Sequence, residues 1–145
     1  MKEILQKLKI VLGDLEREYG IVLLFAFFLR EEALGRWDLL ISAPWLEPRV
    51  LNSYEKVSKA IQKHLDNKEL LQISRIVVLE ADDPAVAFLQ DLHSVPNGSF
   101  VEVQNCEPLS DKFGFTIKRA FVLRCIKHGD DTQDKKPSES DRRLQ

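Results

Sequence analysis

The chain has few of the residues that mark specialised classes of protein. Among its 145 residues are 2 cysteines, 1 methionine, 6 glycines and 6 prolines, and 21 basic residues nearly balance 23 acidic ones. So few cysteines exclude a disulfide-rich scaffold, and so little glycine and proline excludes collagen-like and low-complexity chains. No apolar run reaches the roughly 18 residues that a membrane-spanning helix needs. With 44% hydrophobic and 30% charged residues, the composition predicts a soluble globular domain.

The charge balance and the cysteines also indicate which binding partners and which cellular compartment to expect. A net charge of -2 gives no long-range attraction for phosphate backbones, so we expect neither nucleic acid nor a membrane as a partner. Residues 1–20 contain acids throughout, which is not the pattern of a secretory leader. Cys106 and Cys125 have neither CxxC spacing nor a histidine nearby at the spacing of metal ligands. Reduced thiols and a cytoplasmic location are the expectation.

Hydrophobic periodicity predicts where helices and strands lie. Residues 21–29 and 37–43 are short, nearly continuous apolar runs on either side of the polar, glycine-containing segment 30–36, which is the pattern of a buried hairpin. Apolar residues three and four positions apart predict amphipathic helices. One helix is expected before Gly20, one after Pro48 and a short one after Pro84, with further strands at 73–79, 100–103 and 115–126.

The order of these elements predicts the fold class. The sequence α-β-β-α-β-α-β-β indicates a single α/β or α+β domain over residues 1–127, with a mixed sheet of about five strands and helices packed on it. Strands at 37–43 and 73–79 are separated by a helix, which allows them to run parallel. Residues 128–145 contain almost no apolar side chain. We expect them to form a flexible polar tail.

Three acids are the candidates for chemistry. Asp38 lies inside the second apolar strand, while Glu80 and Asp82 follow the third. If those strands are neighbours, the three carboxylates could converge at one edge of the sheet and hold a divalent metal for phosphoryl transfer. The structural interpretation has Asp38 end a hairpin pairing near solvent, bonded to Arg30 or Arg36. It has Asp82 and Asp83 at a helix start, where negative charge is favourable.

The segment FAFFLREEALGRWDLLI, residues 25–41, resembles the strand-turn-strand region of minimal nucleotidyltransferases. That family has a Gly-Ser pair after its first strand and two acids separated by one residue on its second. Here the first strand continues as Ala26-Phe27-Phe28, and Leu40 occupies the place of the second acid. Helix, hairpin and strand in this order are also similar to restriction-endonuclease-like cores, although no lysine stands at the required step after Glu80-Ala81-Asp82. What the resemblance implies is a metal-dependent enzyme or an inactive relative of one.

A second candidate site is the loop after residues 37–43. Ser42 and Trp45 follow a strand and precede a helix, which is where α/β sheets bind ligands. Trp45 could supply an aromatic wall and Ser42 a polar contact. The alternative is that Pro44 shapes the turn and Trp45 packs against the next helix.

The residues contain no complete catalytic set. We therefore expect a non-enzymatic interaction or self-associating module, with another copy of the chain or another protein as partner and no evident cofactor. The last strand, which carries Lys118, Arg119 and Arg124, is expected at a sheet edge, where cations prevent unwanted pairing or where the strand extends a partner's sheet. A metal-dependent phosphoryl-transfer enzyme or its inactive descendant, with a divalent metal as cofactor, is the alternative.

Overall fold

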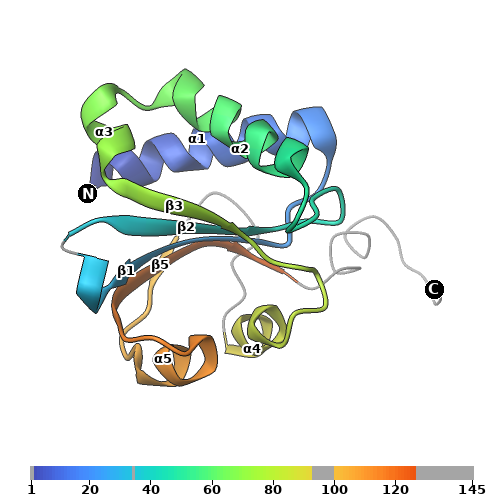
Figure 1. Ribbon diagram of the computed structural model, residues 1–145. Helices are drawn as coiled ribbons and strands as arrows, with labels where there is room; N and C mark the ends of the chain where they lie inside the picture. Colours follow the sequence, from blue (N-terminus) through green and yellow to red (C-terminus); the bar gives the residue numbers. More distant parts are fainter. Residues whose placement is uncertain (1, 34, 93–99, 127–145) are drawn as a thin grey trace.

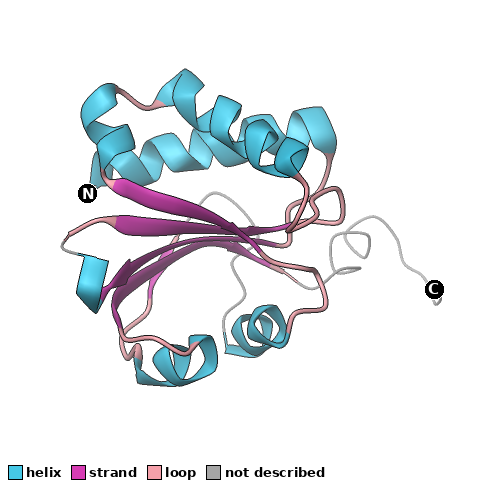
Figure 2. Cartoon of the chain, viewed as in Figure 1, coloured by secondary structure: helices cyan, strands magenta, loops and turns pink. Residues whose placement is uncertain are grey.

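A five-stranded sheet lies between two layers of helices (Figures 1 and 2). The computed structural model describes residues 2–33, 35–92 and 100–126. The strand order is β3-β2-β1-β5-β4. Only β2 and β3 run parallel, and the other neighbours are antiparallel. The strands are β1 (Leu24–Arg30), β2 (Trp37–Ser42), β3 (Ile73–Val78), β4 (Val101–Glu102) and β5 (Ile117–Cys125).

Helices α1 (Lys2–Tyr19), α2 (Leu51–His64) and α3 (Asn67–Leu71) cover one face of the sheet (Figure 1). Helix α1 buries an apolar stripe at three- and four-residue spacing, which includes Leu5, Leu8, Leu12 and Leu15. It ends before Gly20, whose φ of 123° suits glycine alone. On this face Phe27 and Trp37, from adjacent strands, stack with ring centroids 4.8 Å apart. Each fully buried side chain of this size contributes about 1.5–3 kcal/mol.

The opposite face carries the shorter helices α4 (Pro84–Leu92) and α5 (Glu107–Phe113). Strand alternation turns Leu24, Ala26 and Phe28 of β1 toward these helices. Both layers thus meet a β1 that is buried over most of its length, which is why its sequence is continuously apolar.

The mixed α/β architecture, the single domain and the parallel pairing of β2 with β3 agree with the predictions. Two helices were not predicted: α3 and α5, the second of which lies where a plain connection was expected. No helix in the described part of the chain is long and apolar enough to cross a membrane. The turn at 95–99 and the tail at 128–145 lie outside the described residues.

The expected position of the last strand is wrong. Strand β5 pairs with β1 along its length and with β4 on its other side, so it lies inside the sheet. Arg124 is accordingly only 5% exposed and forms an ion pair with Glu16 of α1. Arg119 does remain exposed and pairs with Glu102 of β4. Arg119 and Arg124 of β5 therefore bind neighbouring elements instead of protecting an outer edge.

Candidate functional site

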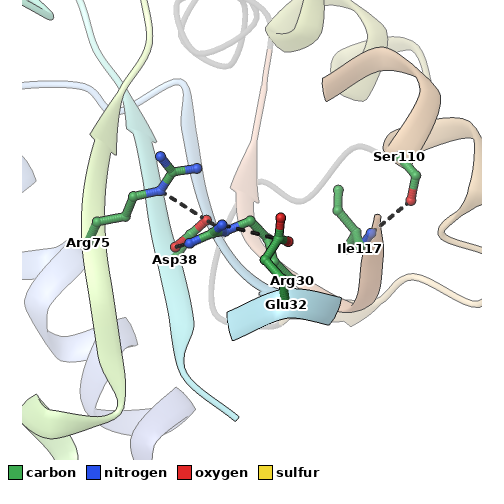
Figure 3. A network of polar contacts seen from close by, with 6 residues as sticks. All are labelled: Arg30, Glu32, Asp38, Arg75, Ser110 and Ile117. Atoms are coloured by element: carbon green, nitrogen blue, oxygen red, sulfur yellow. Dashed lines mark hydrogen bonds and ion pairs between the residues drawn. The ribbon is translucent and has the colours of Figure 1, made fainter. Parts of the chain in front are cut away.

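Asp38 lies near the start of β2 and is 1% exposed. Its side chain is on the face covered by α4 and α5, between Arg30 of β1 and Arg75 of β3 (Figure 3). The Nε atom of Arg30 donates to Oδ2 at 2.7 Å, and Nε of Arg75 lies 3.2 Å from the same oxygen. The expected ion pair with Arg30 is present, and Arg75 is an additional partner. The expected position near solvent is wrong, because Asp38 is buried.

The two guanidinium groups complete a compact polar network around Asp38. Their central carbons lie 5.6 Å (Arg30) and 5.8 Å (Arg75) from the ring centroid of Phe115, and Glu32 is 3.7 Å from Arg30. A carboxylate buried this deeply needs charged partners, because removing it from water costs several kcal/mol. A metal at Asp38 would have to displace cations that already neutralise it.

Glu80 and Asp82 lie at the other end of the parallel strand pair. They line a cavity of about 510 Å³ between the loop after β2 and the loop after β3. Asp38 is level with Arg75 in β3, and Glu80 follows five residues later, which is roughly 16 Å along a strand. The structure thus brings Glu80 and Asp82 to one cavity and leaves Asp38 far from both. Nor do any three His, Cys, Asp or Glu side chains gather as metal ligands within the described ranges.

The cavity has the position of a ligand site in an α/β sheet, at the carboxyl ends of parallel strands. Its charges oppose one another, because Arg49 and the start of α2 favour an anion while Glu47, Glu80 and Asp82 favour a cation. Apolar side chains form the rest of its wall, among them Pro44, Leu46 and Val50. The lining therefore selects no single class of ligand.

Ser42 and Trp45 do not line that cavity, although the loop between them does. Ser42 is fully buried, and its Oγ has no hydrogen-bond partner among the described residues. The indole nitrogen of Trp45 donates to the carbonyl oxygens of Gly20 (3.1 Å) and Ile21 (2.8 Å). Its ring stacks on Tyr19 at 4.9 Å. Trp45 thus fixes the loop to the end of α1.

The two cysteines are both free. Burial raises the pKa of Cys125 to about 12 and also raises that of Cys106. Both side chains belong to the core on the α4/α5 face. Thiols with raised pKa values are weak nucleophiles at neutral pH, so neither cysteine has the environment of a catalytic one.

Among the described residues, strand β3 pairs only with β2 and so forms a free edge of the sheet. The sequence patterns did not identify this edge as a site. Strand β3 is the terminal strand in the order, and one residue of its six, Arg75, is charged. The N–H of Leu79 donates to Ile41 of β2, so strand alternation turns the backbone groups of Val78 and Ile76 outward. Beside this edge lies a groove of about 240 Å³, bordered on the α2 side by Ser58, Ile61 and Gln62.

Two more features describe this edge. The pairing with β2 skips Ser74, which leaves a bulge at the start of β3 and a regular edge from Arg75 to Val78. Leu71, which ends α3 just before β3, is 70% exposed. The sequence ISRIVV, with only one charged residue, is compatible with an edge that can pair with another strand. The sequence pattern does not show that this strand lies at the edge, because that depends on the strand order.

Compared with known proteins, the chain matches no family model, no curated protein and no solved structure.

Proposed function

We propose that the chain is a self-associating module that pairs with a second copy of itself through the free edge of β3. The observation that carries the proposal is the unprotected character of this edge. Natural edge strands carry lysines, prolines or bulges that discourage pairing. Here the bulge at Ser74 affects only the beginning of the strand, and the backbone groups of Ile76 and Val78 point outward next to the groove beside α2.

A second copy fits the edge because two-fold antiparallel pairing provides hydrogen-bond partners for the outward-facing backbone groups of β3 in both copies. Outward-facing residues form the hydrogen-bonded pairs of such a ladder, and Ile76 is the middle one of Ser74, Ile76 and Val78. Centring the axis on Ile76 places each Ile76 against its counterpart. Arg75 then lies opposite Val77 of the second copy, so no like charges face one another directly. The result is a continuous ten-stranded sheet across the two copies.

The charges of α2 favour the same arrangement. Lys56, Lys59 and Lys63 lie along the cleft beside α1, near Asp14 and Glu18. The part of α2 that borders the groove beside β3 is uncharged, with Ser58 and Gln62 hydrogen-bonded to each other at 3.0 Å. Two copies joined at β3 would therefore bring neutral stretches of α2 together instead of lysines.

Light scattering coupled to size-exclusion chromatography tests this proposal across a wide range of protein concentration. We expect the wild type to shift from monomer to dimer, and we expect Ile76→Lys to remain monomeric because it places two ammonium groups at the axis. Ile10→Lys is the matched control, since Ile10 is an exposed isoleucine on α1 (51%). Gln62→Lys repeats the test at the rim of the groove without altering the core.

A wild type that remains monomeric at every concentration would contradict the proposal. So would a dimer that survives both Ile76→Lys and Gln62→Lys. The geometry does not favour the phosphoryl-transfer alternative, because Asp38 lies apart from Glu80 and Asp82 and is bound by two arginines.

A further inference from the structure

The single charge on β3 belongs to Arg75, whose side chain is 48% exposed. A cation on an edge strand ordinarily discourages pairing with another strand. In this structure the side chain does not extend over the free edge. It reaches inward to Asp38 on the neighbouring strand β2, as Figure 3 shows.

Asp38 acts on Arg75 in two ways. Its Oδ2 holds the guanidinium 3.2 Å away, and the ring of Phe115 lies 5.8 Å from the guanidinium carbon, so the side chain is kept over the α5 side of the sheet. The carboxylate also neutralises the cation. In the dimer centred on Ile76, the two Arg75 residues are diagonal neighbours, about 7–8 Å apart. Without Asp38, two uncompensated positive charges would lie next to the axis.

We propose that Asp38 makes the β3 edge competent for self-association by withdrawing and neutralising Arg75. This inference rests on the proposed function, and it makes Asp38 a positioning residue for the interface. It also accounts for a buried acid on an otherwise apolar inner strand, since Asp38 is the one charged residue of β2.

Three variants separate this role from a purely structural one: Asp38→Asn, Arg75→Gln and the double variant. Sedimentation equilibrium gives the dimer dissociation constant of each. We expect Asp38→Asn to raise the constant about tenfold, because the freed arginines repel across the axis. Arg75→Gln should associate at least as tightly as the wild type. The double variant should match Arg75→Gln, because position 75 then carries no charge that Asp38 could restrain.

The outcomes distinguish the two proposals. A monomeric wild type would overturn both. A wild-type dimer together with Arg75→Gln weakened as much as Asp38→Asn, or a double variant that is not rescued, would overturn this inference alone. Circular dichroism checks the fold of each variant. If Asp38→Asn does not fold, Arg75→Glu replaces it, because a second carboxylate cannot be neutralised by Asp38 and should abolish pairing. A dimer as tight with glutamate as with glutamine would overturn the inference.

Discussion

The two ends of the parallel pair β2–β3 hold acids in opposite circumstances. At one end Asp38 is 1% exposed and bound by two arginines. At the other end Glu80 and Asp82 are exposed at the wall of an open cavity. The comparison shows that an acid on an inner strand is not by itself a catalytic signal. What matters is whether its neighbours already neutralise it, and at Asp38 they do.

The largest effect is expected at the buried end. Asp38→Ala removes the main partner of Arg30, whose side chain is 17% exposed. It also removes the carboxylate that binds Arg75. Breaking a buried ion pair lowers the free energy of unfolding by about 3–5 kcal/mol. Because Arg75 is half exposed, we expect a loss at the lower end of this range, about 3 kcal/mol. Urea unfolding measures the loss. Glu80→Ala is the matched control at the other end and should change the unfolding free energy by less than about 0.5 kcal/mol.

The second largest loss of stability is expected at Trp45, which joins the loop after β2 to the end of α1. Trp45→Phe keeps the stacking on Tyr19 and removes the hydrogen bonds to Gly20 and Ile21. At about 0.5–1.5 kcal/mol for a hydrogen bond, we expect a loss of about 1–2 kcal/mol in urea unfolding. Leu51→Ala, at a side chain 72% exposed at the start of α2, is the control. Equal losses in both variants would refute the anchoring role of Trp45.

The sequence patterns predicted those parts of the fold that depend on local periodicity. The stripe of α1 and the β1–β2 hairpin are examples, because burial on one or two faces leaves its period in the sequence. Helix α3 was missed although Asp66 and Glu69 form a capping box, in which each side chain accepts from the other residue's N–H. Helix α5 was missed because the segment between the strands expected at 100–103 and 115–126 contains Pro108 and Ser110, which are common in loops. Proline also suits a first helical turn, and that is its place here.

The candidate site was harder to predict because it depends on contacts between strands. Arg30 was one of the two partners proposed for Asp38, since a hairpin brings residues close in sequence together. Arg75 was not, because its place beside Asp38 requires β3 to add next to β2 in one register. The interior position of β5 has the same origin. A strand's neighbours are chosen by the whole fold, so its amino-acid pattern shows burial but not position.

The pH dependence of stability tests a third acid, Asp14, whose principal partner is a histidine, His64, and not an arginine. A side-chain hydrogen bond with His64 holds the pKa of Asp14 below its ordinary value of 3.8, with further help from Arg17 and Lys63. A carboxyl whose pKa is lowered in the folded state stabilises it at pH values above 3.8, and this contribution disappears as the pH falls below that value. We expect His64→Phe to flatten the acid limb of the unfolding free energy measured between about pH 5 and pH 2.5. An unchanged limb in that variant would contradict the role of His64.

The smallest effect is expected from the acids of the cavity. The side chains of Glu80 and Asp82 are exposed, so Glu80→Gln and Asp82→Asn should each change the unfolding free energy by less than about 0.5 kcal/mol. Glu80→Gln, together with Asp38→Asn, also tests whether the three acids hold a divalent metal. Since Asp38 lies roughly 16 Å along the strands from Glu80, calorimetric titration with Mn²⁺ should show no saturable heat that depends on Asp38. Saturable heat that is lost in Asp38→Asn and also in Glu80→Gln would require the two ends of the strand pair to approach one another, and would restore the phosphoryl-transfer alternative.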